Sequence, residues 1–243
     1  MAPGEHRAKD GEPGAADALP VLHRDDDILV VDKPAGLAVH QAPGAGRTLE
    51  PLLDLMRFGL VQAPVPAHRL DRDTTGCLVL GRHPEALRRL NRLFAAGAVD
   101  KIYWAVVEGL VGAESGVVDR RLLKVRRAGA WSIIADRRGD AARTRWRVLG
   151  RGDGRTWLEL RPLTGRMHQL RVHCAGMGHP LVADPLYGRP GLPGERLHLH
   201  ARSVGLADRH GQRIDVLAAA PRQMVPALTA CGFAPGDSVA PAG

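Results

Sequence analysis

The sequence predicts an α+β fold, and three observations support this. Segments rich in β-branched and aromatic residues follow one another in groups, so the strand–helix alternation of a doubly wound fold is missing. Apolar and polar residues alternate at 157–161, which favours antiparallel strands. The patterns GxGxxG, GxxxxGK(S/T) and GxSxG do not occur, so dinucleotide-binding, Walker-type and serine-hydrolase architectures gain no support.

The N-terminal part is expected to form two strands and a short helix. Residues 27–32 are a β-branched run ended by turn residues at 33–36, and residues 37–40 could form the returning strand. Thr48 is a possible N-cap of the helix, whose apolar residues recur at helical spacing: Leu49, Leu52, Leu53 and Met56.

A buried strand and a longer helix are expected next. Residues 77–80 are apolar throughout, and Pro84 suits the first position of a helix that Gly97 would end. The apolar face of this helix comprises Leu87, Leu90, Leu93 and Phe94. Further strands are expected over residues 102–107, 131–135, 144–149, 156–160 and 197–201.

One domain is expected between residues 21 and 231, because this span shows neither a repeat of fixed period nor a strong linker. Residues 1–20 and 232–243 are rich in Gly, Pro and Ala, and we expect them to be flexible tails.

The charge of the chain favours a polyanionic partner. The formal net charge is +8, and residues 120–147 carry ten basic residues against Asp136 and Asp140. A basic strip of this kind can steer nucleic acid through phosphate contacts. An arginine-rich protein with Arg on every solvated face would look similar, so charge alone does not decide.

Neither export nor membrane insertion is indicated. The chain lacks a run of about 18 to 20 apolar residues and a signal-peptide core. Its three cysteines are far apart, which suits neither a disulfide framework nor a zinc knuckle. We therefore expect a soluble protein of the reducing cytoplasm.

A dense polar segment at residues 68–76 should form a loop that enters the strand at 77–80. Within it, Asp71 has Arg and His neighbours, which keep a carboxylate ionised, as a nucleophile needs. A surface Asx-turn held by ion pairs would have the same composition, so the segment alone leaves both interpretations open.

A second polar segment, residues 163–173, is expected to form a turn followed by a helix. Arg166, Gln169 and His173 fall at spacings of three and four, with Leu170 beside them. This face could bind phosphate or hold a remote carboxylate, although a solvated helix face would show the same pattern. The histidines come without HExxH or an accompanying carboxylate, so we expect no metal site.

Four ordered segments resemble those of RluA-type pseudouridine synthases. HRLDRDTTG at 68–76 is similar to their HRLDxxTSG signature, and residues 163–188 to GRxHQ(I/L)RVH…GHP…GDPLYG. Residues 101–109 match the K-x-Y-x-A-x-V-x-G strand, and residues 28–40 the strand and KPAGLxVH turn. The departures are small: Thr75, Met167, Cys174 and Ala183.

The resemblance implies one catalytic domain with a mixed, mainly antiparallel, bipartite sheet flanked by helices and loops, without the S4 RNA-binding domain of many relatives. It implies an isomerase that converts uridine to pseudouridine in structured tRNA or rRNA, with no cofactor. We expect a monomer. Because the N1–C1′ bond is cut and the uracil turned, the nucleotide must leave its stack.

The resemblance also implies roles for single residues. Asp71 would be the catalytic carboxylate, Arg171 its ion-pair partner, and Tyr103 the ring that stacks on uracil and takes part in proton removal. Arg69 would occupy the space left by the flipped base. Other substrate contacts are expected from His68, Arg166 and Leu170.

Two other functions stay open at this point. A non-catalytic RNA-binding protein on the same fold would keep the basic surface but should lose the acid at position 71. A metal-dependent nuclease using Asp71, Asp73 and histidines would need divalent ions. The sequence chooses neither between tRNA and rRNA nor between a covalent adduct and a glycal-type intermediate.

Overall fold

The computed structural model describes residues 19–41, 46–127 and 130–234 of the chain. Within these residues, ten strands form one sheet in the order β1-β2-β4-β11-β5-β10-β9-β6, with β12 paired to β11 and β3 to β4. All of its strand pairs are antiparallel except β4 with β11. The predicted α+β class and the mixed, mainly antiparallel sheet are therefore confirmed.

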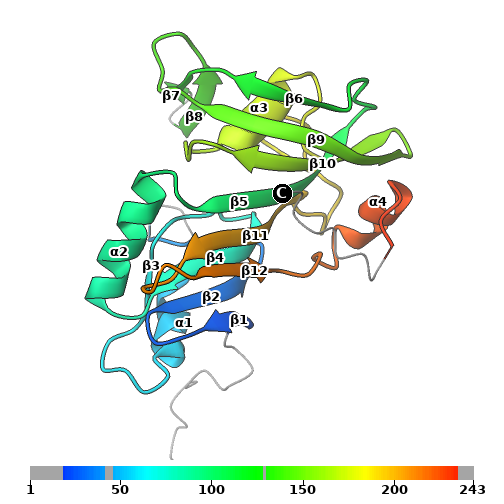
Figure 1. Ribbon diagram of the computed structural model, residues 1–243. Coiled ribbons are helices and arrows are strands. Elements are labelled where there is room, and N and C mark those ends of the chain that lie inside the picture. Colours follow the sequence, from blue (N-terminus) through cyan, green and yellow to red (C-terminus); the bar gives the residue numbers. More distant parts are fainter. Residues whose placement is uncertain (1–18, 42–45, 128–129, 235–243) are drawn as a thin grey trace, which may run out of the picture.

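The sheet has two halves, which Figure 1 shows one above the other. The lower half contains the N-terminal elements and two late strands: β1 (Val21–Arg24), β2 (Ile28–Lys33), β3 (Val65–Pro66), β4 (Thr75–Gly81), β11 (Leu199–Ala207) and β12 (Arg213–Leu217). Its helical elements are α1 (Glu50–Leu53), η2 (Asp54–Met56) and α2 (Pro84–Ala95).

The upper half contains β6 (Ser115–Asp119), β9 (Arg143–Gly152), β10 (Arg155–Pro162) and α3 (Gln169–Gly176), and α4 (Val225–Ala230) lies at the right of Figure 1, away from α3. A separate hairpin of β7 (Leu122–Arg127) and β8 (Ala130–Ala135) lies at the top of Figure 1. β5 (Asp100–Glu108) pairs with β11 on one side and β10 on the other, so it joins the two halves.

The predicted return strand at residues 37–40 is wrong. Both edges of β2 are already occupied, by β1 and by β4, so no further strand can pair with it. Leu37 and Val39 instead turn inward and are buried in the core with β2 and β4. The helix predicted after Thr48 is present as α1 and η2, but its N-cap is Leu49 and no side-chain hydrogen bond caps it.

α2 begins and ends where the sequence predicted. Pro84 occupies its first turn, and Gly97 follows the C-cap with a φ of +68°, the left-handed conformation that glycine adopts without strain. His83 is the N-cap, and its Nδ1 accepts a hydrogen bond from the backbone N–H of Ala86 at 3.3 Å. Leu90 is fully buried, which packs the helix against the lower half of the sheet.

An aromatic cluster closes the core near the end of the described chain. Trp104 on β5 and Trp157 on β10 meet edge to face at 4.8 Å, and Phe233 lies 5.6 Å from each. Phe233 is buried, although it falls within the segment 232–243 that we expected to be a tail. Residues 1–18 and 235–243 of the two expected tails lie outside the described residues.

None of the helices in the described ranges is both long and apolar enough to cross a membrane.

Candidate active site

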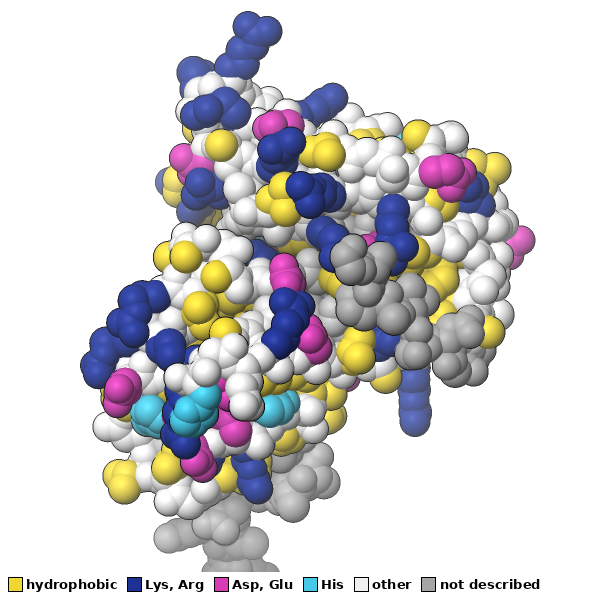
Figure 2. All heavy atoms as spheres, viewed as in Figure 1, with side chains coloured by type: hydrophobic (Ala, Val, Ile, Leu, Met, Phe, Trp, Pro, Cys, Tyr) yellow, Lys and Arg dark blue, Asp and Glu magenta, His cyan; other side chains and the backbone are white. Residues whose placement is uncertain are grey.

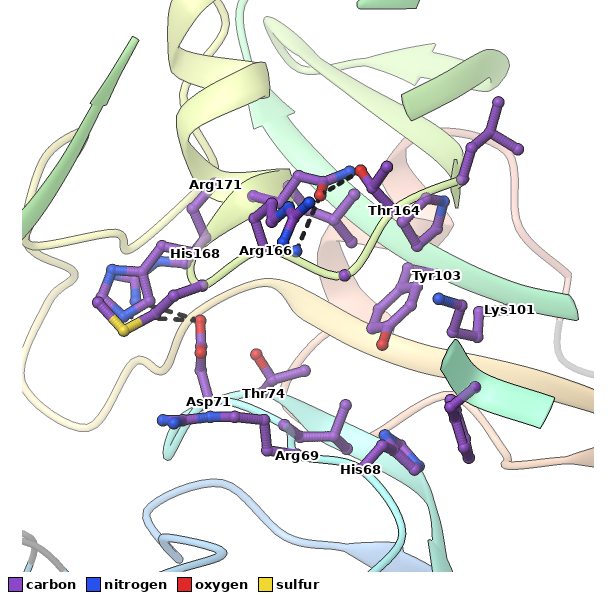
Figure 3. Close-up of a pocket in the computed structure, with 18 of the residues that line it drawn as sticks. His68, Arg69, Asp71, Thr74, Lys101, Tyr103, Thr164, Arg166, His168 and Arg171 are labelled. Atoms are coloured by element: carbon purple, nitrogen blue, oxygen red, sulfur yellow. Dashed lines mark hydrogen bonds and ion pairs between the residues drawn. The ribbon is translucent and has the colours of Figure 1, made fainter. Parts of the chain in front are cut away.

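A cavity of about 580 Å³ is lined mainly by three segments that are far apart in the sequence, with further contacts from the end of α2 and from Leu199. They are the loop before β4, the start of β5, and the turn that leads into α3 (Figure 3). A volume of this size is typical of sites that hold a small molecule or a single extruded group. The structure brings all seven predicted site residues to this cavity: His68, Arg69, Asp71, Tyr103, Arg166, Leu170 and Arg171.

The loop that carries Asp71 is held from below by Lys33. Lys33 is fully buried, and its ammonium group donates hydrogen bonds to the carbonyls of Pro34, Leu37 and Arg72 at 2.8, 2.9 and 2.9 Å. The backbone N–H of Gly36 donates to the same Arg72 carbonyl. Burial lowers the pKa of Lys33 to about 8, even though nearby carboxylates favour its charged form. The turn at 33–36 therefore fixes the residue next to Asp71.

The entry into β4 is fixed by its parallel contact with β11. Gly76 has a φ of +104°, and a Cβ there would collide with the Ala201 carbonyl, so only glycine fits. The Thr75 hydroxyl is hydrogen-bonded to His200 Nδ1 at 2.8 Å. These contacts fix the start of β4 against β11, and with it the position at which residues 71–74 face the cavity.

Asp71 faces a guanidinium and an imidazole, both on the turn and helix above it (Figure 3). Arg171 Nη1 lies 3.6 Å from Asp71 Oδ2, and His168 Nε2 lies 3.9 Å from the same oxygen. Both distances exceed those of hydrogen bonds, so the contact with Arg171 is an ion-pair contact. The predicted pairing of Asp71 with Arg171 is present, but it is loose.

The tight partner of Arg171 is Asp184, which the sequence analysis did not single out. Arg171 Nε and Nη2 donate to the two Asp184 oxygens at 2.9 and 2.7 Å. Asp184 is fully buried and also accepts from the backbone N–H groups of Leu186 and Tyr187. Burial alone would raise the pKa of Asp184, but Arg171 and these N–H groups hold it below its ordinary value. This bidentate pair fixes the direction of the guanidinium.

Arg166 does not lie on the face of α3 where we predicted it. The helix begins at Gln169, whose buried amide oxygen accepts from the Thr164 hydroxyl and the Arg166 backbone N–H. His168 adopts a φ of +51°, which interrupts the helical geometry just before α3. Residues 163–168 therefore form a turn at the cavity. The alternative of a solvated helix face is wrong, because six residues of α3 from Gln169 to Cys174 are buried.

His68 is a neutral part of the cavity wall. Its Nε2 accepts the backbone N–H of Val79 at 3.0 Å, and its ring stacks on Phe94 with centroids 4.7 Å apart. Burial lowers the pKa of His68 to about 4. Its placement suits the support of the neighbouring Arg69 better than a charged contact with a substrate.

Four further lining residues are an apolar, an aromatic and two cationic side chains. Leu170 is buried, and Tyr103 faces the cavity from β5 (Figure 3). Burial, together with the charge of Asp71, raises the pKa of the Tyr103 phenol. Among the described residues, the side chains of Arg69 and Lys101 form no hydrogen bond or ion pair, so both cations are free for an anionic ligand.

Within the described ranges, no group of three or more His, Cys, Asp or Glu residues is placed to hold a metal ion. The predicted basic strip lies mainly on the β7–β8 hairpin and β9. Figure 2 shows Lys and Arg side chains projecting from the upper part of the molecule, where the hairpin lies. On the hairpin, the Lys124 ammonium lies 4.4 Å from the ring centre of the exposed Trp131.

Comparisons with known proteins identify the family. The family model described as RNA pseudouridylate synthase matches residues 27–176, which include Asp71, Tyr103 and Arg171. The chain belongs to this family. It is 42% identical over 216 residues to an uncharacterized RNA pseudouridine synthase of Zymomonas mobilis, covering 88% of this chain and 97% of the relative.

A second relative of this pseudouridine synthase is the ribosomal large subunit pseudouridine synthase D of Pseudomonas aeruginosa. The two are 38% identical over 192 residues, which make up 77% of this chain and 57% of that relative. The match thus spans little more than half of the longer relative's length. Among solved structures, human RNA pseudouridylate synthase domain containing 4 superposes with a TM-score of 0.73 and 27% identity, over 86% of this chain and 92% of that one.

Proposed function

We propose that the synthase converts uridine to pseudouridine within structured RNA, and that Asp71 is the carboxylate that acts on the flipped nucleotide. The observation that carries this proposal is the meeting of Asp71, Tyr103 and Arg171 in one cavity, although they come from three distant segments. Arg171 is only 8% exposed and held by a second carboxylate, so a rigid cation faces the acid.

The reaction requires an extruded nucleotide. The N1–C1′ bond breaks, the uracil turns, a C5–C1′ bond forms, C5 loses its proton, and N1, which carried the ribose, gains one. No electron is gained or lost, so the isomerisation balances without an oxidant or reductant. Inside a helical stack the base could not turn, and extrusion costs about a few kcal/mol of stacking and pairing. The exposed Arg69 at the cavity edge is suited to fill the vacated space.

Asp71 acts at the ribose in this proposal. Both a covalent adduct at C1′ and a glycal-type intermediate place the carboxylate beside the sugar, so its position serves either route. Arg171 stabilises the negative charge of the Asp71 carboxylate without forming a short hydrogen bond to it, since 3.6 Å separates the two groups.

Tyr103 is assigned to stacking on the uracil. The raised pKa of its phenol keeps the hydroxyl protonated at neutral pH, which disfavours its use as the base in the final proton removal. Leu170 supplies an apolar contact beside the ring, and Arg166 is placed to reach a phosphate at the rim.

The substrate is RNA, and the basic surface over the hairpin and β9 supports phosphate contacts. One relative is named for the large ribosomal subunit, which makes ribosomal RNA a candidate beside tRNA. We further propose that residues 21–231 contain the complete catalytic machinery and act as a monomer. The three cysteines are free and buried, in keeping with the reducing cytoplasm.

The test uses ribosomal and transfer RNA transcribed in vitro with tritium at C5 of uridine. Joining C5 to C1′ releases that tritium to water, so release measures isomerisation directly. We expect release by the purified full chain, without an added cofactor and in the presence of a chelator. The RNA should stay intact.

The two competing functions predict different results in the same assay. A non-catalytic RNA-binding protein would retain the RNA on a filter and release no tritium. A metal-dependent nuclease would shorten the RNA, and the chelator would stop it. Either result would overturn the proposed function.

A further inference from the structure

Asp71 has a neighbour to which the proposed function gives no role. His168 Nε2 lies 3.9 Å from Asp71 Oδ2, and the His168 side chain is only 16% exposed. Arg171, the cation beside Asp71, already shares its charge with Asp184 at 2.7 Å. Together, Arg171 and Asp184 carry almost no net charge. The orientation of the Asp71 carboxylate therefore depends on the other groups that face it.

Tyr187 fixes the ring of His168. The Tyr187 hydroxyl is hydrogen-bonded to His168 Nδ1 at 2.8 Å, and the two rings meet edge to face at 5.6 Å. The same hydroxyl oxygen accepts the backbone N–H of Ile133 at 3.1 Å. The Ser132 side chain is a further hydrogen-bond partner of this hydroxyl. With the Ile133 N–H and the Ser132 hydroxyl donating to its two lone pairs, the hydroxyl hydrogen points at Nδ1. That arrangement leaves the ring proton on Nε2, the nitrogen that faces Asp71.

Tyr187 also contacts Arg171, the cation beside the acid. Its ring centre lies 5.2 Å from Arg171 Cζ, so the ring covers the guanidinium while the hydroxyl holds the imidazole. One side chain therefore orients both the guanidinium and the imidazole that face Asp71.

The bond to Ile133 links this arrangement to the β7–β8 hairpin. Ile133 of β8 and Leu122 of β7 are buried in a small cluster with Ala142 and Val172, and Met167 and Tyr187 pack against it. The hairpin thus rests on the residues that flank His168 in sequence and in space. Its outer face carries the basic side chains proposed to meet RNA phosphates.

We propose that His168 is a positioning residue that directs Asp71 through its Nε2–H, and that Tyr187 couples this contact to the RNA-facing β7–β8 hairpin. The inference rests on the proposed function of the cavity. In the free protein the contact is held at ion-pair distance. Seating of RNA on the hairpin would press Tyr187 and His168 toward the acid and bring Nε2 within hydrogen-bond reach.

The charged and titratable groups around His168 allow it to act as a neutral donor. Burial lowers its pKa most strongly, and the charges of Arg171 and Arg69 act in the same direction. Asp71 and Asp184 oppose them, but the net pKa lies below the ordinary value. At neutral pH, His168 therefore offers one N–H to Asp71 and not a full charge.

Two amide variants distinguish the roles of the two ring nitrogens of His168. Gln places its amide nitrogen near the position of Nε2, whereas Asn places its amide near Nδ1 and does not reach Asp71. The backbone favours Asn, because Asn tolerates the left-handed φ of +51° better than Gln does. A lower activity of His168→Asn than of His168→Gln could not then be attributed to backbone strain.

We measure tritium release under single-turnover conditions, with RNA binding and thermal unfolding measured on the same samples. We expect His168→Gln to stay within about threefold of the wild type, and His168→Asn and Tyr187→Phe to slow about tenfold, the factor for one lost hydrogen bond. RNA affinity should change less than about twofold, since neither residue belongs to the basic surface. The double variant should be no slower than His168→Asn alone, because Tyr187 acts through His168.

Equal rates for the Gln and Asn variants would overturn the proposal, and so would losses that multiply in the double variant. A second measurement needs no RNA. Nitrogen-15 spectra of the histidine rings, with His168→Gln to assign the signal, should show the Nε2–H tautomer in the wild type and its loss in Tyr187→Phe. A Nδ1–H tautomer in the wild type would refute the inference even if the enzyme is active. Failure of the proposed function would instead appear as an inactive wild type with the expected spectra.

Discussion

Replacing Asp184 by Asn should destabilise the fold and misdirect the active-site guanidinium together. Asp184 is fully buried and receives two charge-assisted hydrogen bonds from Arg171, at 2.9 and 2.7 Å. Asn keeps one carbonyl acceptor but turns an NH₂ group toward the second guanidinium nitrogen. Each such bond contributes about 1.5 to 3 kcal/mol, and breaking a buried pair costs about 3 to 5 kcal/mol. We expect a loss of about 3 to 5 kcal/mol in the free energy of unfolding.

Glu159→Gln is the matched control. Glu159 is 3% exposed and binds two guanidinium groups, those of Arg147 and Arg161, but it does not line the cavity. Because those arginines are about a third exposed, water can replace the lost bonds, and we expect about 1 to 3 kcal/mol.

Urea unfolding gives the two free energies, and tritium release measured well below the transition gives the two rates. Asp184→Asn should release tritium at least about tenfold more slowly, because Arg171 loses its fixed direction toward Asp71. Glu159→Gln should keep the wild-type rate. The reasoning is refuted if Asp184→Asn costs less than about 1 kcal/mol, or if the control loses as much conversion as Asp184→Asn.

Three further outcomes are expected. Lys33→Met should lower both the free energy of unfolding, by about 1 to 3 kcal/mol, and conversion, because it removes the ammonium group that joins the carbonyls of Pro34 and Leu37 to that of Arg72 beside Asp71; an unchanged urea midpoint would contradict this. Lys101→Gln should slow tritium release with no loss of melting temperature, since this half-buried cation has no partner among the described residues; a drop in melting temperature at full activity would assign it to the fold. Burial lowers the pKa of His198 and His200 from 6.5 to about 4, so only the unfolded chain binds these protons between those values. The free energy of unfolding therefore falls as the pH is lowered from 7 to 5, by about 2 kcal/mol for each histidine. Urea unfolding at pH 7 and at pH 5 checks this.

The sequence predicted correctly those elements whose first and last residues are determined by their neighbours along the chain. Pro84 and Gly97 bracket α2 because capping and left-handed conformations depend on a few neighbouring residues. The return strand at 37–40 failed for the opposite reason. Whether β2 has a free edge depends on β1 and β4, and nothing within residues 28–40 reports that.

The candidate site shows the same division. The resemblance brought Asp71 and Arg171 to one place, but the spacing of residues could not reveal that Arg171 is bound first by Asp184. The spacing of residues also placed Arg166 on a helix, because helical spacing does not show that the amide of Gln169 holds the preceding turn. Lys33 carried a readable signal, a lysine that ends a buried strand before Pro34, although that signal alone did not say what it binds.

The central claim is that the carboxylate at position 71 carries out the isomerisation, and a pair of Asn variants tests it most directly. Asp73 lies two positions further along the same loop and pairs with Arg72 at 3.1 Å, which makes Asp73→Asn the matched change of charge. In single-turnover tritium release, we expect Asp71→Asn to be slower by at least about a thousandfold, with RNA affinity within about twofold of the wild type. Asp73→Asn should keep most of the activity. Tritium release by Asp71→Asn at a rate near that of the wild type would contradict the account.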